Sequence, residues 1–269
     1  MLDTQGHDLT EDLAQARVVR QMLGMQQLGP QGLSEQWVLG FCGDAHWALI
    51  ARSIRQEGLC FRTIDGRPLY AAFCATRLEL SETGPLLGED LVIRSELSGT
   101  GGAKIGSRHV FLHRGQEIGR LLMLSTFVAH DTTGSNRRIT RALPARQYEL
   151  PPAGPDLMAL DARARQVSRG VRGQTVAAES AEQVTPSFPL DFNAVGLLYF
   201  PSFSRIIEQV ARTSAPLRMR EVIYLGNLDP GDTLRVQRKG AETRVARDCG
   251  RIIAQAREDR SPAALNLDG

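Results

Sequence analysis

Two short polar segments stand directly before apolar stretches with helical spacing, and both could bind a carbonyl oxygen. The first contains Ser34 and Gln36, and the second contains Asp191, Asn193 and Gly196. The first turn of a helix has unpaired backbone N–H groups, which can stabilise negative charge on such an oxygen. Gly196 would let the backbone approach a ligand closely. Because Ser and Asp are also common helix N-caps, each segment is predicted to be a cap, a binding site or both.

Histidine and hydroxyl side chains offer a second set of candidates. His46 could orient a substrate or donate a proton, although a single histidine on a helix is more often structural. Ser125 and Thr126 end a predicted strand and are candidates for lining a pocket. His109 and His113 are four residues apart on another predicted strand, about 13 Å along it, which is too far to share a metal ion. We expect these two at the surface and expect no metal site.

Other motifs of catalysis are missing from the sequence. It has neither Gly-x-Ser-x-Gly nor His-Glu-x-x-His, so it indicates neither a serine hydrolase nor a zinc peptidase. The glycine-rich segment SGTGGAKIGS lies between two predicted strands without the residue order of a phosphate-binding loop, and a hairpin turn is expected there. The four cysteines lack Cys-x-x-Cys spacing, so we expect buried thiols. No resident cofactor is indicated.

The composition is that of a globular protein. The 269 residues are 42% hydrophobic and 23% charged, which suits one large domain or two ordinary ones. The net charge of +2 is too small to predict nucleic-acid binding, and codon usage is favoured over an arginine-built anion site as the reason for the many arginines. No apolar run reaches the roughly 18–20 residues that span a bilayer, and the polar start does not resemble a signal sequence. We therefore expect a cytoplasmic protein with no membrane partner.

The first half of the chain is predicted to be one helix followed by an antiparallel meander. Apolar residues recur every four positions from Trp37 to Leu49, and Ser34 precedes them as an N-cap. After Gly58 the period changes to that of strands. The four predicted strands are 69–80, 90–99, 107–115 and 117–131.

The second half repeats this order. A helix with Phe203, Ile206 and Ile207 on one face precedes four more strand-like segments, and aligning the two helices pairs Ser34 with Asp191. The sequence between is predicted to be a long crossover with one short helix. The predicted units are 17–140, a linker at 141–182, and 183–260.

A long helix wrapped by an antiparallel sheet, present twice, resembles the double hot-dog fold of the α+β class. The resemblance is strongest at DFNAVGLLYFPSF, Asp191 to Phe203, which is similar to the helix start of 4-hydroxybenzoyl-CoA-type thioesterases. It implies acyl thioesters of coenzyme A or acyl carrier protein as substrates. Where those enzymes carry a second carboxylate, this chain has Asn193, which can be neither base nor nucleophile. Simple hydrolysis is therefore less favoured.

A narrower resemblance lies in GLSEQWVLGFCGDAHW, Gly32 to Trp47, and GRPLYAAF, Gly66 to Phe73. Both are similar to the leinamycin-type bifunctional acyltransferase/decarboxylases of polyketide biosynthesis, and the likeness extends into the second half. Members of that family transfer methylmalonyl from coenzyme A to a tyrosine, decarboxylate it, and deliver propionyl to a carrier protein. By motif position that tyrosine is Tyr70. The resemblance implies an acyl-CoA substrate and an acyl carrier protein as partner.

We accordingly expect Tyr70 to be the nucleophile, Ser34 and Gln36 to hold the thioester oxygen, and His46 and Asn193 to orient the substrate. One alternative is a thioesterase that uses Asp191 and releases free acid without a covalent adduct. Another is a non-catalytic module that binds an acyl chain or its carrier. A homodimer is left open, because a duplicated chain already contains two halves.

Overall fold

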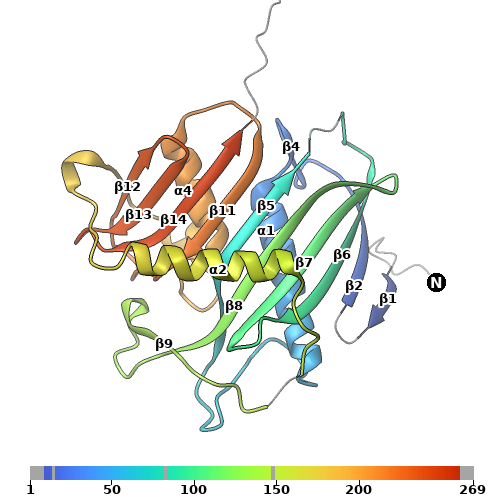
Figure 1. Cartoon of the computed structure of the whole chain (residues 1–269), viewed down its shortest axis with the longest axis horizontal. Helices are drawn as coiled ribbons and strands as arrows, with labels where there is room; N and C mark the ends of the chain where they lie inside the picture. The colour runs from blue at the N-terminus through green and yellow to red at the C-terminus, as the bar shows by residue number, and fades with distance from the viewer. Residues whose placement is uncertain (1–8, 14–15, 82–83, 147–148, 261–269) are drawn as a thin grey trace, which may run out of the picture.

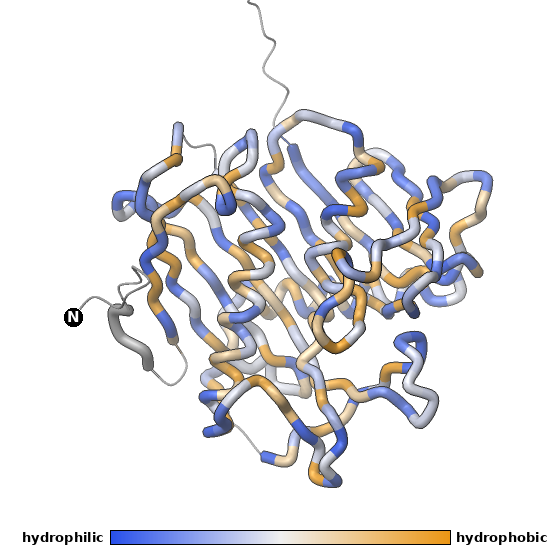
Figure 2. The backbone as a smooth tube through the Cα atoms, turned by 180° about the vertical axis from the view of Figure 1, so that it is seen from behind, coloured by the Kyte–Doolittle hydropathy of each residue, from blue (hydrophilic) through white to orange (hydrophobic). Residues whose placement is uncertain are grey.

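The computed structural model describes residues 9–13, 16–81, 84–146 and 149–260. Twelve of the described strands form one sheet, in the order β1-β2-β6-β7-β8-β5-β11-β14-β13-β12-β10, with β9 paired to β8. A separate small hairpin consists of β3 (Leu28–Gly29) and β4 (Gly32–Leu33). In Figure 1 the helix α2 crosses one face of the large sheet, while α1 and α4 lie behind it. Figure 2 shows the reverse side.

The N-terminal half contributes the longest strands, since its sequence alternates or is continuously apolar over ten or more residues. Their bounds are β1 Leu9–Leu13, β2 Ala16–Met22, β5 Tyr70–Leu80, β6 Asp90–Gly99, β7 Lys104–His113, β8 Gln116–His130 and β9 Ile139–Arg141. The four predicted strands exist, but the predicted meander is wrong, because β5 pairs with β8 and not with β6. β7 and β8 therefore lie between β6 and β5, and β5 stands at the middle of the sheet.

The C-terminal half adds shorter strands. Their bounds are β10 Glu182–Val184, β11 Leu217–Tyr224, β12 Leu234–Lys239, β13 Glu242–Arg247 and β14 Ile252–Arg260. The halves join where β11 pairs with β5, and this register runs from Met219 opposite Glu79 to Ile223 opposite Ala75. Beyond that stretch each strand pairs only within its own half.

The helix α1 (Glu35–Ser53) forms as the sequence predicts. Ser34 caps it by accepting a hydrogen bond from the Trp37 N–H at 3.4 Å. The helix buries Val38, Cys42 and Leu49 against the sheet, because these residues share one face. The core of the N-terminal half is thus built between α1 and its strands.

The helix α4 (Phe200–Ala211) plays the same part in the C-terminal half, with Phe203, Ile206 and Ile207 buried. Its N-cap is Tyr199, so the alignment of Ser34 with Asp191 misplaces the second helix start by eight positions. Asp191 instead ends a separate short helix, α3 (Phe188–Asp191). The apolar spacing predicted the helix correctly. The alignment of Ser34 with Asp191 is wrong because a turn separates Asp191 from the helix start.

The crossover contains a full helix, α2 (Pro155–Gly170), where a short one was predicted. Its apolar residues Leu157, Leu160 and Ala164 pack on Leu124 and Ile223, on the sheet face opposite α1. A single strip of apolar residues is enough to hold such a helix on a sheet. The helix spans the junction of the two halves.

The cysteines differ from the expectation of buried thiols. Cys42 is buried and Cys74 partly buried, but Cys60 and Cys249 are exposed. Within the described part of the chain, no helix is long and apolar enough to cross a membrane, and no cluster of metal-ligating side chains exists.

Candidate functional site

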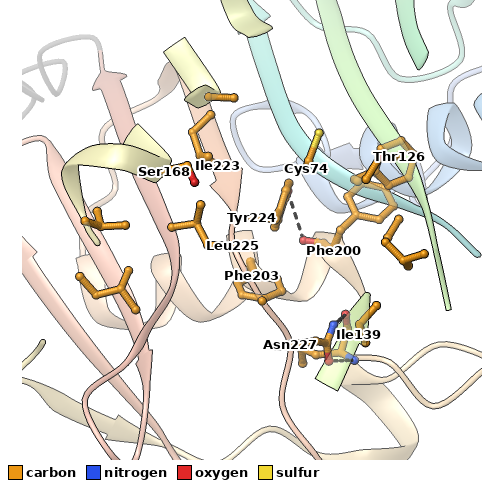
Figure 3. A pocket seen from close by; sticks show the side chains of 18 of the residues that line it. Cys74, Thr126, Ile139, Ser168, Phe200, Phe203, Ile223, Tyr224, Leu225 and Asn227 are labelled. Carbon is orange, nitrogen blue, oxygen red and sulfur yellow. Dashed lines mark hydrogen bonds between the residues drawn. The ribbon is translucent and has the colours of Figure 1, made fainter. Parts of the chain in front are cut away.

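A cavity of about 970 Å³ opens where the two halves meet. Its walls include Phe73 and Cys74 of β5 and Tyr224 of β11, which lie just outside the stretch where these strands pair with each other. Cys74 is the extra residue of a bulge, since Phe73 pairs with Ser125 and Ala75 with Leu124. We call this cavity the seam pocket, and Figure 3 shows side chains of β5, β8, β11 and α4 around it.

One side of the seam pocket is apolar and aromatic. Phe73 and Phe200 pack with their ring centroids 4.3 Å apart, and Trp47 stacks on Phe73 at 5.7 Å. The Trp47 indole N–H donates to the Ala71 carbonyl at 2.8 Å, which fixes the ring. Phe203 contributes further apolar wall from α4. Such surface suits an acyl chain, because its burial releases water from apolar area on both partners.

Basic side chains also line the seam pocket, and most of them are exposed on its solvent side. Its basic lining residues are Lys104, Arg137, Arg141, Arg165, Arg169, Arg172, Arg247 and Arg251. Among the described lining residues there is no Asp, Glu or His. Lys104 and Arg165 both pair with the buried Asp161 of α2, and Arg137 pairs with Asp232. The remaining arginines give this side of the pocket an excess of positive charge.

Several hydroxyl and thiol groups in the seam pocket are held in their protonated forms. Burial, with a smaller effect of the Asp44 carboxylate, raises the pKa of Tyr199 to about 12. Burial also raises the pKa of Tyr224, whose hydroxyl hydrogen-bonds with Thr76 at 3.0 Å. The Cys74 thiol has its pKa raised by burial to about 11. These groups can donate hydrogen bonds to a carbonyl oxygen but are poor bases near neutral pH.

Tyr70 lies near the seam pocket but is not among its lining residues. Its ring packs edge-on against His130, with centroids 5.5 Å apart. The His130 Nε2 hydrogen-bonds with the Asn136 side-chain oxygen at 2.8 Å, and Asn136 lines the pocket. Tyr70 is therefore joined to the pocket wall at Asn136 through one intervening side chain, that of His130.

Ser34 and Gln36 also lie outside the lining of the pocket. Ser34 caps α1, and the exposed Gln36 donates from Nε2 to the Pro201 carbonyl at 2.7 Å, which ties α1 to the start of α4. In this conformation both residues hold the two central helices.

Of the second group of predicted site residues, one lines the pocket and the others have structural roles. Asp191 is 2% exposed and accepts two hydrogen bonds from Arg205, at 2.8 and 2.7 Å. Asn193 lines the seam pocket, and its side-chain oxygen accepts from the Leu197 N–H at 3.0 Å. Gly196 has a φ of 77°, so the turn requires its lack of a side chain. Asn193 alone of these predicted residues reaches the pocket lining.

Thr126 lines the seam pocket as predicted, with its hydroxyl donating to the Ala103 carbonyl at 3.1 Å. His46 is fully buried and hydrogen-bonds with Ser107 at 2.7 Å and Ser125 at 2.8 Å. Its position behind Phe73, with ring centroids 5.0 Å apart, keeps it out of the lining. The expectation that His109 lies at the surface is wrong, because its side chain is completely buried.

Sequence reasoning missed the arginines of the seam pocket, which it attributed to codon usage. Arg137, Arg169, Arg172 and Arg247 come from three separate segments of the chain. Their spacing along the sequence carries no signal, because only the fold brings them together.

No family model matches the chain, and no curated protein matches it. Several solved structures match the chain. An acyl-ACP thioesterase from Bacteroides thetaiotaomicron superposes with a TM-score of 0.65 at 11% identity, covering 91% of this chain and 98% of that one. The 12:0-ACP thioesterase from Umbellularia californica gives 0.66 at 14% identity, covering 92% and 97%. The predicted α+β double hot-dog fold is confirmed, and the narrower resemblance stays a prediction.

Proposed function

We propose that this chain is an enzyme of acyl thioesters, with the acyl group bound in the apolar part of the seam pocket and an anionic carrier at its cationic side. One observation carries the proposal: a single cavity joins aromatic walls to a group of basic side chains, with no acidic residue among its described lining. Acyl-CoA and acyl carrier protein both join an apolar chain to phosphate through a thioester. Either would match this division of the pocket.

Hydrolysis is the first reaction to consider. The similar solved structures carry the names of acyl-ACP thioesterases, and the similarity extends over more than nine tenths of this chain. The Tyr199 hydroxyl is one donor in the lining that can polarise a thioester carbonyl, whereas the Tyr224 hydroxyl already bonds with Thr76 and the Phe200 carbonyl. The expected products are a free acid and the free thiol.

Acyl transfer with decarboxylation is the second candidate, and one feature of the described lining supports it. Hydrolysis needs a base to activate water, and neither carboxylate nor imidazole is present among the described lining residues. A malonyl-type substrate brings its own carboxylate, which the basic side chains would attract. In that reaction the Tyr70 oxygen attacks the thioester carbonyl and the thiol leaves with the phenolic proton. Carbon dioxide is then lost, the resulting enolate takes a proton, and a carrier thiol receives the acyl group.

Tyr70 would need to turn from His130 toward the pocket to act in this way. Ionising a tyrosine near neutral pH costs about 4 kcal/mol, at about 1.4 kcal/mol per pKa unit, and nearby positive charge would lower that cost. Asp191 is a weaker candidate for the hydrolytic base, because its carboxylate is engaged by Arg205. Ser34, Gln36, His46 and Gly196 are assigned to support of the helices and turns around the site.

The test is incubation with acyl-CoA and methylmalonyl-CoA, with and without carrier protein, followed by intact-mass and product analysis. A protein-bound ester that is absent in Tyr70→Phe and present in Tyr199→Phe supports transfer through Tyr70. Free acid without an adduct supports hydrolysis. Tight binding without turnover indicates a non-catalytic module, and absence of both binding and turnover would overturn the proposal.

A further inference from the structure

Arg247 is a buried charge without a carboxylate partner in the described part of the chain. It is 6% exposed and lines the seam pocket. Its Nε donates to the Asn227 carbonyl at 2.8 Å, and Nη2 donates to the same oxygen. A neutral carbonyl does not balance the charge of a guanidinium, so the residue is held where an anion would stabilise it.

A tight turn sets a second arginine beside the first. The Arg247 N–H donates to the Arg251 carbonyl at 2.9 Å, and the Gly250 N–H returns to the Arg247 carbonyl at 2.8 Å. Both arginines line the seam pocket. Burial lowers the pKa of Arg247, and repulsion by Arg251 and Arg137 lowers it further. Asp229 opposes this shift, and all three arginines line the same pocket.

Arg137 is brought to this position by the loop after β8. The Asn136 N–H donates to Asp229 at 2.7 Å, and the Asn136 side chain donates to the Leu228 carbonyl at 3.0 Å. The Arg137 Nε donates to Asp232 at 2.9 Å, and the guanidinium also pairs with Asp229 at 3.6 Å and Asp248 at 4.0 Å. These bonds hold the loop against the C-terminal half beside Arg247. The charge of Arg137 is thus offset, and the charge beside it that stays unpaired among the described residues is that of Arg247 and Arg251.

The pocket lining contains further arginines whose positive charge is not paired within the described chain. Arg141, Arg169, Arg172 and Arg251 have no carboxylate partner among the described residues. All four are exposed, so they lie at the solvent side, whereas the aromatic walls are buried. Guanidinium groups present several N–H donors in a planar fork that matches phosphate oxygens. A phosphate would thus be bound at the solvent side while the apolar group is held inside.

We infer that Arg247 and Arg251, with Arg137 beside them, bind a phosphate group of the arm that carries the acyl thioester. This inference rests on the proposed function, since it names the part of the substrate that these residues hold. Coenzyme A and a carrier protein both supply such a phosphate on phosphopantetheine. The same three arginines would serve either source.

The experiment measures the binding of stable thioether analogues that share one alkyl chain. The chain is attached to pantetheine, to 4′-phosphopantetheine, to coenzyme A, and to phosphopantetheine on a carrier protein. We expect the wild-type protein to bind the phosphopantetheine form about ten- to a hundred-fold more tightly than the pantetheine form. A further gain with coenzyme A identifies the free cofactor as the source, and a further gain with the carrier identifies the protein; both support the phosphate site.

Arg251→Gln and Arg247→Gln should reduce the preference for phosphate toward unity while binding of the pantetheine form is retained. Arg251 is exposed, so its variant keeps the test decisive if the Arg247 variant fails to fold. Arg138→Gln is the matched control, since Arg138 adjoins Arg137 but lies outside the pocket lining, with its side chain 68% exposed. Its preference should remain that of the wild type.

Different results would contradict the phosphate site and the proposed function. Equal affinity of the wild-type protein for the pantetheine and phosphopantetheine forms overturns the phosphate site and leaves the proposed function standing. Coenzyme A without an alkyl chain is measured alongside, and its binding as tightly as the alkyl thioether would retain the phosphate site and contradict the proposed function. An equal loss of preference in Arg138→Gln also overturns the assignment, because general surface charge would then explain the affinity.

Discussion

The N-terminal half buries a neutral network of histidine and serine side chains, whereas a network of ion pairs lies buried where that half meets the C-terminal one. In the first network His46 hydrogen-bonds with Ser107 and Ser125, and His109 hydrogen-bonds with Ser107 and with Ser95, at 2.7 to 2.8 Å. Burial lowers the pKa of His109 to about 3 and that of His46 well below its ordinary range. Both rings are therefore neutral, and their hydrogen bonds cross from α1 to β6, β7 and β8.

The second network centres on Arg220 of β11, whose side chain is 1% exposed. Its Nη2 donates to Glu258 of β14 at 2.8 Å, and it also pairs with Glu208 of α4 and with Glu35 at the start of α1. Burial would raise the pKa of Glu258, but hydrogen bonds from Arg260 and Arg220 outweigh it and lower that pKa. Glu35 belongs to the N-terminal half, so this cluster connects the two halves. The difference indicates that neutral polar groups organise one core while paired charges fix the junction of the two halves.

The largest expected effect comes from the ionic network. Arg220→Met should lower the free energy of unfolding by about 3–5 kcal/mol, because the partly buried Glu35 would lose its arginine partner. Among the described residues, Glu258 would keep only Arg260 and Arg238. Urea denaturation followed by circular dichroism measures this change. The similar volume of methionine limits any contribution from a cavity.

Arg212→Ala is the control for this prediction. Arg212 pairs with Glu182 at the surface, where their side chains are 73% and 46% exposed. Such a pair contributes about 0–1 kcal/mol. If Arg220→Met costs no more than Arg212→Ala, the ionic network does not hold the halves together.

The histidine network should give the next largest effect, through pH. The folded state disfavours the protonated form of His109, so between its folded pKa of about 3 and the ordinary 6.5 the unfolded chain binds more protons. Stability is then fully present above pH 6.5 and decreases as the pH falls below it, by up to about 1.4 kcal/mol per pH unit for each histidine. His109→Gln should remove one such contribution. Denaturation curves from pH 7 to pH 4.5, compared between wild type and variant, measure the difference in slope.

Ser95→Ala separates titration from hydrogen bonding. It removes a partner of His109 at 2.8 Å but leaves the titrating ring in place. We expect lower stability at every pH with the wild-type slope retained. Identical slopes in wild type and His109→Gln would instead show that the buried ring does not titrate on unfolding.

These networks also show what the sequence could and could not predict. The helix α1, the Ser34 cap and the strands follow from local periodicity, and the double hot-dog fold follows from their repetition. The burial of His109 could not be predicted, because its partners Ser95 and Ser107 depend on the pairing of β6 with β7. The seam pocket forms where β5 and β11 cease to pair, and no local sequence pattern predicts that position.

The smallest expected effect connects the helix start with the ionic network. Ser34→Ala removes the N-cap hydrogen bond of α1 and should cost about 0.5–1 kcal/mol, in the lower part of the range for caps, since the bond is 3.4 Å long. Glu35, the next residue, pairs with Arg220, so the cap also positions one carboxylate of the junction. The effects of Ser34→Ala and Arg220→Met should therefore not add, with a coupling of about 0.5 kcal/mol or more in a double-mutant cycle. The pair Ser34→Ala and Arg212→Ala, which share no contact, should be additive, and equal additivity in both cycles would separate the cap from the junction.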